Sequence, residues 1–425
     1  MKPAPRWPSW HFLFLALLLA WFAQPASAED AQSLFNEYGD LIYQIRIIDQ
    51  ISGKQAGIGS GFVVDGNGRI VSNYHVVAEI LAEPDRYRLE FVSSNGQEGP
   101  LTVLNVDVPN DLALLKMDAS TPKYLSLAAA LPEQGAAIYS LGNPHDLGLT
   151  VIPGTYNGIA ARSANQRIHF SGSINPGMSG GPALNSSGEI IGVNVATAGN
   201  QISFLVALDK LRSFLEEPLL QDFSIEAIDR LITEQLVKSQ AQTAAHLLNE
   251  QWPIEPFGEV RIPQTIAPYV RCWGQSNDDP DLLYEHSVTR CDSEERVFLR
   301  SGFDTGRLLY RFDWLKTEDL SPLQFYGALS QLIQNIRPDN AAEEEDVTPF
   351  TCHEGFAGGR EQSVVKATFC ARGYKRFKGL FDVLYVGMSV HEDRRALMSH
   401  FTIAGVTQEN GLSFVKKFLE SIQWN

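Results

Sequence analysis

The stretch from Ile174 to Pro182 constrains this chain more than any other, because its backbone must turn sharply around one serine. It runs Ile-Asn-Pro-Gly-Met-Ser-Gly-Gly-Pro, so three glycines and two prolines surround Ser179. Glycine reaches positive φ at little cost, and proline fixes φ. A strand-like run from Glu189 to Ala196 follows after a Ser-Ser-Gly turn. We therefore expect an exposed serine on a rigid loop, which suits a nucleophile, although a lone Gly-x-Ser-Gly-Gly also fits a simple tight turn.

A serine hydroxyl needs a base and an orienting carboxylate before it can attack an amide at neutral pH. Upstream, residues 61–77 predict two strands joined by an Asp-Gly-Asn-Gly turn, with His75 just beyond the second strand. Asp111 opens the apolar strand Leu-Ala-Leu-Leu-Lys and is preferred over its competitor Asp107 for this reason. The order His75, Asp111, Ser179 is that of the chymotrypsin arrangement and differs from the order in subtilisin and in the α/β-hydrolases.

Four motifs in this order resemble the protease domain of the HtrA/Deg-type, trypsin-like serine proteases. They are Gly59-Ser-Gly-Phe-Val-Val with Ser72-Asn-Tyr-His-Val-Val, Asp111-Leu-Ala-Leu-Leu-Lys, Leu141-Gly-Asn-Pro, and Asn175-Pro-Gly-Met-Ser-Gly-Gly-Pro. The resemblance covers about residues 35–215. It implies a mainly β N-terminal half made of two antiparallel six-stranded β-barrels, with the active site between them. It also implies that His75 is the general base, Asp111 its orienting carboxylate and Ser179 the nucleophile.

The same resemblance implies an oxyanion hole formed by the backbone N–H groups of Gly177 and Ser179. Such donors act where negative charge develops in the transition state. Met178 departs from the family pattern, in which Asn is usual at this place and digestive enzymes have Asp. Activation in which a new N-terminus pairs with that Asp therefore has no partner in this chain.

A pocket for the residue that precedes the cut bond is expected beside this loop. We expect it to be lined by Ser173, Val193, Val195 and Phe204. No acidic residue marks its floor, so the sequence predicts a preference for small or medium apolar side chains over Lys or Arg.

Residues 1–28 have the pattern of a secretory signal peptide. Lys2 and Arg6 precede an apolar run from Phe12 to Ala23, and Ala26-Ser-Ala ends the segment with small residues. The apolar run is shorter than the roughly 20 residues that a membrane-spanning helix needs. We therefore expect an exported protein with no stable membrane insertion after cleavage, first in the bacterial periplasm and second as a secreted protein.

The charge of the chain argues against nucleic acid as a partner. The formal net charge is −16, and removal of residues 1–28 takes away two basic residues and no acidic ones. So acidic a chain is repelled by phosphate backbones and anionic lipids. Protein or peptide substrates are the expected partners, and the sequence leaves homo-oligomerisation open. The chemistry of a serine nucleophile predicts no cofactor and no metal.

Residues beyond the predicted protease domain follow other patterns. Apolar residues recur at helical spacing from Ser224 to Trp252 and predict a connector of one or two helices.

All four cysteines lie beyond this connector. Cys272 and Cys291 are separated by 19 positions and Cys352 and Cys370 by 18, and each pair precedes an apolar strand and a helix. This weak duplication favours the disulfides Cys272–Cys291 and Cys352–Cys370 in an oxidising compartment, with zinc as the rival explanation. The acidic run 339–346 predicts a solvated, mobile loop.

These patterns predict four parts: a signal peptide (1–28), a trypsin-like protease domain (29–215), a helical connector (216–254) and a C-terminal α+β accessory domain with disulfides (255–425). The function they predict is that of an exported serine endopeptidase which cleaves peptide bonds through a Ser-His-Asp triad and an acyl-enzyme. The alternative is a catalytically silent scaffold with the same fold that acts through its C-terminal domain.

Overall fold

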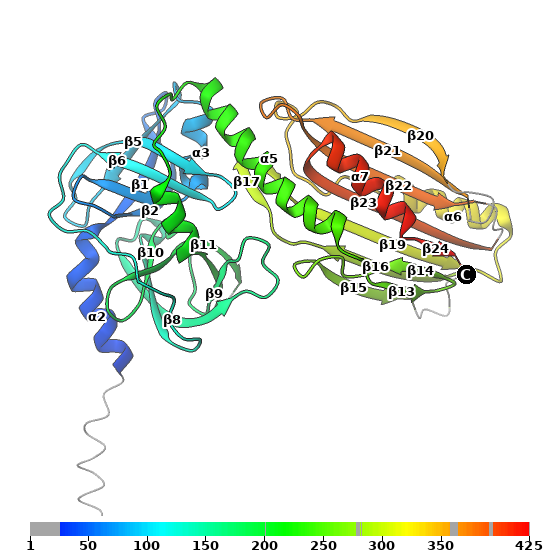
Figure 1. Ribbon diagram of the computed structural model, residues 1–425, viewed down its shortest axis with the longest axis horizontal. Coiled ribbons are helices and arrows are strands. Elements are labelled where there is room, and N and C mark those ends of the chain that lie inside the picture. Colours follow the sequence, from blue (N-terminus) through cyan, green and yellow to red (C-terminus); the bar gives the residue numbers. More distant parts are fainter. Residues whose placement is uncertain are drawn as a thin grey trace, which may run out of the picture.

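The computed structural model describes residues 26–199, 201–277, 281, 283–357, 364–390 and 394–424. Two β-barrels and a large sheet form the two ends of the molecule, and the helix α5 (Ile225–Asn249) runs from one to the other (Figure 1). The segment 1–25 of the predicted signal peptide lies outside the described residues. Helix α2 (Ala26–Tyr38) begins at the predicted cleavage site.

The N-terminal half forms the two closed six-stranded antiparallel barrels that the sequence predicts. In the first barrel the strands pair in the order β1-β2-β3-β6-β5-β4. Their bounds are β1 (Ile42–Asp49), β2 (Lys54–Val63), β3 (Arg69–Ser72), β4 (Tyr87–Val92), β5 (Glu98–Asp107) and β6 (Leu112–Met117). Helix α3 (Tyr74–Ala82) follows β3, and the 3-10 turn η1 (Gly39–Leu41) precedes β1.

In the second barrel the order is β10-β11-β12-β9-β8-β7. The bounds are β7 (Ala137–Gly142), β8 (Thr150–Ile159), β9 (Ile168–Phe170), β10 (Pro182–Leu184), β11 (Ile190–Gly199) and β12 (Ile202–Ala207). A second 3-10 turn, η2 (Pro144–Asp146), follows β7, and α4 (Leu208–Glu216) follows β12.

The turn before β3 shows how local sequence fixes the first barrel. One Asp65 carboxylate oxygen accepts the backbone N–H groups of Asn67 and Arg69, and Gly68 has a φ of 78°. Asp and Gly are favoured in such turns because Asp bonds its own backbone and Gly tolerates positive φ. The turn places β3, and therefore His75 just beyond it, against β2 and β6.

The connector is one long helix. It begins at Ser224, whose hydroxyl accepts the N–H of Ala227, and continues through α5 without interruption. The face of α5 with Ile228, Ile232 and Leu236 is buried against the first barrel, and the face with Leu247 packs on the C-terminal sheet. The helix is therefore packed on both parts of the molecule along its length.

The C-terminal region is built on a seven-stranded antiparallel sheet with the order β15-β16-β19-β23-β22-β21-β20. The bounds are β15 (Arg271–Ser276), β16 (Glu285–Asp292), β19 (Leu308–Lys316), β20 (Thr351–Ala357), β21 (Val365–Gly373), β22 (Leu380–Ser389) and β23 (Arg395–Thr407). Smaller sheets are formed by β13 (Ile254–Phe257), β14 (Val260–Pro263) and β24 (Gln423–Trp424), and by the hairpin of β17 (Val297–Arg300) and β18 (Phe303–Thr305).

The two predicted disulfides are present, one at each edge of this sheet. Cys272 lies directly opposite Cys291 on β15 and β16, and Cys352 lies directly opposite Cys370 on β20 and β21. Each sheet edge is thus a disulfide-linked pair of strands. A helix follows each of the central strands: α6 (Pro322–Gln334) comes after β19 and α7 (Gln408–Glu420) after β23.

These helices cover opposite faces of the sheet. Alternate residues of a strand point to opposite faces. On β23, Leu397 shares a core cluster with Phe414 and Phe418 of α7, whereas Met398 shares one with Phe325 of α6. The C-terminal region is therefore an α+β domain with two cores, as the sequence predicts in outline.

The acidic run 339–346 is anchored, so the prediction of a solvated, mobile loop is wrong for part of it. Asp346 is buried and its carboxylate accepts from Arg300 at 2.6 Å, while Asp339 accepts from Arg290 at 2.8 Å. The arginines that pair with these carboxylates lie on strands distant in sequence. The run of acidic residues alone therefore does not reveal that it has partners.

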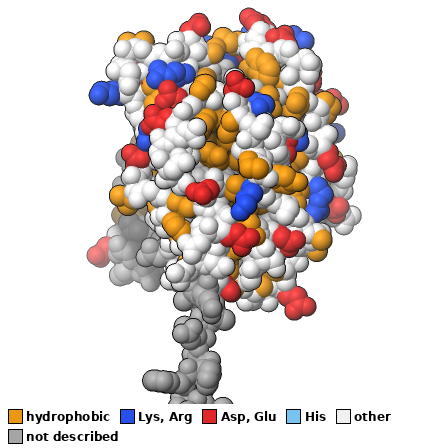
Figure 2. Space-filling model, turned by 90° about the vertical axis from the view of Figure 1, so that its left-hand side faces the viewer, with side chains coloured by type: hydrophobic (Ala, Val, Ile, Leu, Met, Phe, Trp, Pro, Cys, Tyr) orange, Lys and Arg blue, Asp and Glu red, His pale blue; other side chains and the backbone are white. Residues whose placement is uncertain are grey.

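The outer surface of the barrels carries charge of both signs. Figure 2 looks at the barrel end of the molecule, where apolar side chains gather near the centre of the face and acidic and basic side chains are interspersed among them. None of the described helices is both long enough and apolar enough to cross a membrane.

Candidate active site

His75 is the second residue of α3, and its position is set by the residue before the helix. Asn73 is extended, with a φ of −91°, and its side-chain amide donates to the backbone carbonyl of Asp111 at 2.7 Å. This bond joins the start of α3 to the loop before β6. It holds the histidine and the aspartate next to each other although they are 36 positions apart.

Asp111 faces His75 with both carboxylate oxygens. One oxygen accepts the backbone N–H of His75 at 2.9 Å, and the other lies 2.7 Å from the Nδ1 atom of its ring. The backbone of Asp111 has a φ of 60°, an uncommon value outside glycine that Asp and Asn tolerate better than other residues. Asp107, the competitor, bonds instead with Asn110 through its side chain. The geometry therefore selects Asp111 as the partner of the histidine.

The environment favours the charged form of this histidine. Burial lowers the pKa of His75, but the charge of Asp111 and its hydrogen bond raise it more, so that the pKa lies above its usual value. The positive charge of Arg167 acts in the opposite direction. A base with a raised pKa that still keeps part of its ring exposed, 27% of the side chain, is suited to accept and return a proton.

Ser179 sits in the turn that the glycines predict. Gly177 and Gly180 on either side have φ values of 97° and 84°. A Cβ atom on Gly180 would lie 2.2 Å from the carbonyl oxygen of Ser60 and 3.0 Å from the backbone nitrogen of Asn73. The loop that carries Ser179 therefore packs directly on the backbone that leads into His75.

The structure joins two of the three predicted catalytic residues by hydrogen bonds. His75 and Asp111 are paired, whereas the Ser179 hydroxyl makes no hydrogen bond to any residue within the described part of the chain. Such contacts are often long without substrate and tighten when substrate binds.

The two predicted oxyanion donors are free. Neither the N–H of Gly177 nor that of Ser179 has an acceptor among the residues described, whereas the N–H of Met178 between them donates to the carbonyl of Asn175 at 3.0 Å. The Met178 side chain is fully buried in the core of the second barrel. A methionine at this place is therefore anchored by packing, and two unpaired N–H groups lie beside the serine.

Ser60 is a residue of this site that the sequence did not single out. Its hydroxyl donates to the carbonyl of Gly177 at 2.7 Å and accepts the N–H of Asn143 at 2.9 Å, and its own N–H donates to the carbonyl of Ser179. It thus ties β2 to the loop on both sides of Met178. The available signal was its place between two glycines in the Gly59-Ser-Gly motif.

The predicted pocket residues separate into two groups. Val195 and Phe204 border a cavity of about 850 Å³ that also reaches His75 and Asp111. The Ser173 hydroxyl accepts the N–H of Gln201, and Val193 is fully buried between the barrels. Val193 is therefore a core residue here, because its side chain has no surface to offer a substrate.

No group of three or more His, Cys, Asp or Glu side chains in the described ranges is arranged to hold a metal ion. All four cysteines are in disulfides, which removes them as zinc ligands. The rival explanation for the cysteine spacing is therefore wrong.

Known proteins share this site region. Residues 59–193, which include all three predicted catalytic residues, match the family model described as trypsin-like peptidase domain. "Protease Do-like 5, chloroplastic" of Arabidopsis thaliana is 35% identical over 169 residues, which are 36% of this chain and 51% of that protein. "Probable periplasmic serine endoprotease DegP-like" of Chlamydia pneumoniae is 37% identical over 152 residues, 34% of this chain and 29% of that protein. "Serine protease HTRA1B" of Danio rerio is 36% identical over 169 residues, 37% of this chain and 34% of that protein.

The chain thus spans about half the length of these curated relatives or less. Residues 59–193 match a trypsin-like peptidase domain, and the chain is similar to serine proteases of the HtrA/Deg type over about a third of its length.

Proposed function

We propose that the protein is an exported serine endopeptidase that hydrolyses peptide bonds of proteins. The observation that supports this most directly is the His75–Asp111 pair, with 2.7 Å between Nδ1 and the carboxylate oxygen, beside the glycine turn that carries Ser179. Similarity to proteins named as a serine endoprotease and as a serine protease is consistent with it.

In the proposed reaction the Ser179 oxygen attacks the peptide carbonyl while Nε2 of His75 takes the hydroxyl proton. The N–H groups of Gly177 and Ser179 stabilise the oxyanion that forms. The C–N bond then breaks, and the imidazolium gives its proton to the departing amine. Water, deprotonated by His75, hydrolyses the acyl-enzyme and regenerates the serine.

Asp111 keeps its negative charge throughout these steps. It holds Nδ1 of His75 as a donor and stabilises the imidazolium. Its two hydrogen bonds to the ring and to the backbone N–H of His75 fix the direction of the imidazole. When the substrate binds, the Ser179 hydroxyl comes within hydrogen-bond distance of Nε2 of His75.

Export is proposed from the N-terminal pattern and from the disulfides. Two disulfides persist in an oxidising compartment and are rare in the cytosol. The relatives are named after a periplasm, a chloroplast and, for further ones, a mitochondrion. We propose the periplasm first and secretion second.

Cleavage of an unfolded protein tests the proposal. Ser179→Ala should lower kcat about 10⁶-fold, because removal of the nucleophile eliminates the acyl-enzyme route. Ser187→Ala, on an exposed turn, is the matched control and should keep wild-type turnover. A wild-type protein that cleaves no substrate, or a Ser179→Ala variant that cleaves as fast as wild type, would show that the barrels serve as a scaffold.

A further inference from the structure

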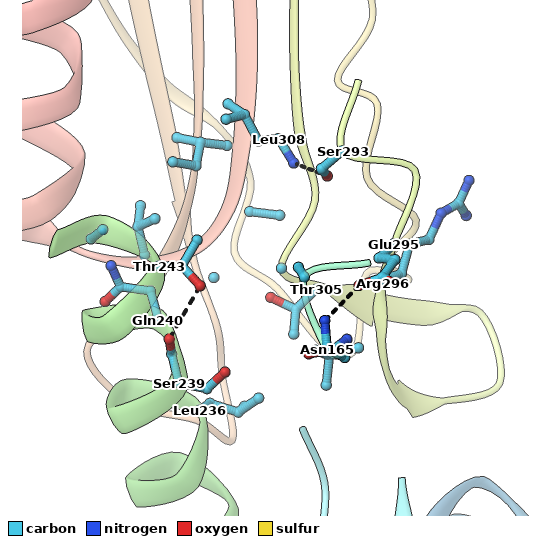
Figure 3. A pocket seen from close by; sticks show the side chains of 18 of the residues that line it. Asn165, Leu236, Ser239, Gln240, Thr243, Ser293, Glu295, Arg296, Thr305 and Leu308 are labelled. Atoms are coloured by element: carbon cyan, nitrogen blue, oxygen red, sulfur yellow. Dashed lines mark hydrogen bonds between the residues drawn. The ribbon is translucent and has the colours of Figure 1, made fainter. Parts of the chain in front are cut away.

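A segment of the C-terminal domain lies against the catalytic histidine. The ring of Phe298 meets the ring of His75 edge to face, with 6.0 Å between the ring centres. Close by, the Glu295 carboxylate accepts the N–H of Asn165 at 3.0 Å, which Figure 3 shows at the boundary of the two parts. These residues follow Cys291 by a few positions, far from the barrels in sequence.

The hairpin β17–β18 is firmly attached to the first barrel. Leu299, next to Phe298, is buried in the same core cluster as residues of the first barrel, and its carbonyl accepts the hydroxyl of Tyr74 at 2.8 Å. The N–H of Ser301 donates to the Glu79 carboxylate of α3 at 2.9 Å. Phe298 packs partly against the same cluster, and its ring faces His75 at the border of the cavity.

Three parts of the chain enclose the cavity beside the histidine. The first barrel supplies His75 and Asp111, the second supplies Val195 and Phe204, and the C-terminal domain supplies Val297 and Phe298. Ser179 is not among the residues that line the cavity, which reaches the candidate active site at His75 and Asp111.

The charged groups around the cavity are largely engaged with each other or with the backbone. Arg271 pairs with Glu294 at 3.3 Å and Arg296 with Asp304 at 2.9 Å, while Arg167 donates to the carbonyl of Asn110 at 3.0 Å. Apart from the exposed Arg162, the partly buried apolar side chains remain the surface that can contact a ligand. A cleft lined in this way recognises apolar side chains.

The cavity also reaches an open strand edge. The pairing of β11 with β10 ends at Val193, whereas its pairing with β12 extends to Gly199. In the described part of the chain no strand pairs with the other edge of β11 at Val195 and Thr197, which border the cavity. An extended peptide can add to such an edge with its side chains entering pockets alternately.

We infer that this cavity is a substrate subsite shared between the two domains, and that Phe298 is a specificity-determining residue within it. The subsite takes a large apolar side chain, such as Leu or Phe, of an extended peptide lying along β11, one or more positions from the cut bond. This inference rests on the proposed endopeptidase function. It gives the C-terminal domain a direct part in substrate selection.

A peptide library varied at each position around the cut bond tests the inference. Wild type should prefer large apolar residues at one flanking position, and Phe298→Ala should lower kcat/KM for those peptides about 10-fold or more and flatten that preference alone. Phe298→Leu should retain part of the preference. Phe356→Ala, an exposed phenylalanine on β20, is the matched control and should leave the profile unchanged.

Labelling of Ser179 by a small fluorophosphonate separates this inference from the proposed function. The probe needs no flanking subsite, so Phe298→Ala should lower cleavage of the preferred peptides by more than it lowers labelling. If the wild-type protein is neither labelled by the probe nor able to cleave peptides, the proposed function itself is refuted. If wild type labels and cleaves but both Phe298 variants keep its profile, the subsite is refuted and the function stands. A gain of cleavage for all peptides in Phe298→Ala, or an equal loss of labelling, would also refute it.

Discussion

Asp111 shows how one backbone angle prepares the site. Its φ of 60° is stabilised by the Asn73 bond to its carbonyl and by its own N–H, which donates to Val108. Arg167 holds the preceding carbonyl, that of Asn110. A residue in this region of φ/ψ costs on the order of 1–3 kcal/mol and persists where the surroundings determine it. The carboxylate therefore reaches the histidine because three neighbours fix the loop.

Asp111→Asn should lower kcat by about 10⁴-fold, because the amide no longer holds the ring in the required tautomer. Asn tolerates positive φ, so the backbone should keep its shape. The Asp111 charge raises the pKa of His75, and activity should therefore fall as pH drops through that raised value in the wild type. The variant should lose activity only at a lower pH. A pH–rate profile measures this, and an unchanged acid limb would contradict the assignment.

His400 gives the C-terminal domain a pH-dependent stability. Burial lowers the pKa of His400 to about 4. The unfolded chain therefore binds a proton between the usual pKa of about 6.5 and about 4 that the folded chain does not bind, so stability falls as pH falls through this range. The loss should approach about 3 kcal/mol.

Denaturant unfolding at a series of pH values tests this. His400→Leu removes the titrating group and should flatten the dependence between these limits. If the stability of the variant declined equally steeply with falling pH, the pH dependence would be due to other groups.

At the scale of single residues, the sequence singles out candidates that stand in local motifs and does not show residues that only the fold brings to the site. His75, Asp111 and Ser179 each stand in a recognisable local pattern. Phe298 lies more than 200 positions from His75 in a plain apolar run, and no local pattern connects the two. Val193 and Val195 would share one face of a regular strand, but the pairing of β11 with β12 shifts register between Asn194 and Ala196. Val193 therefore lies in the core while Val195 borders the cavity, which the sequence does not show.

A disulfide links the two outermost strands at each edge of the C-terminal sheet. Each disulfide joins residues directly opposite on paired strands, with 4.0 Å between the Cα atoms. The spacing of the cysteines predicted the pairs, and β19 and β22 are the apolar strands predicted to follow them. The hairpin β17–β18 was not predicted, because its short strands have too few residues to show a period.

The double variant Cys272→Ala/Cys291→Ala should lower the free energy of unfolding by about 3 kcal/mol, because the bridge restricts the unfolded chain. The Cys352–Cys370 bridge closes a loop of nearly the same length. Cys352→Ala/Cys370→Ala should therefore lower the free energy of unfolding by about as much. Urea unfolding followed by far-UV circular dichroism measures both. A loss below about 1 kcal/mol in either variant would contradict the entropic account.

The whole molecule is held together by a core that crosses from one domain to the other. One cluster contains β-barrel residues such as Ile45, α5 residues such as Ile232, and Leu299 and Phe303 of the hairpin β17–β18. An ion pair between Arg376 and Asp229 joins the C-terminal domain to α5. The sequence predicted both parts and the helix between them, but not this shared core, because its members are scattered over the whole chain.

Phe303→Ala should therefore destabilise the first barrel as well as its own domain, by about 3–5 kcal/mol. Hydrogen exchange resolved along the chain should show faster exchange in β1–β6. Phe325→Ala, in the core under α6, is the matched control and should spare these strands. Unchanged exchange of β1–β6 in Phe303→Ala would mean that the domains are energetically independent.

The central claim, that Ser179 is activated by His75 and Asp111, is tested most directly by fluorophosphonate labelling followed by peptide mapping. We expect a single covalent adduct on Ser179 in the wild-type protein, with labelling lost in His75→Ala. An adduct on another residue, or no adduct over the neutral to mildly alkaline range, would contradict the account.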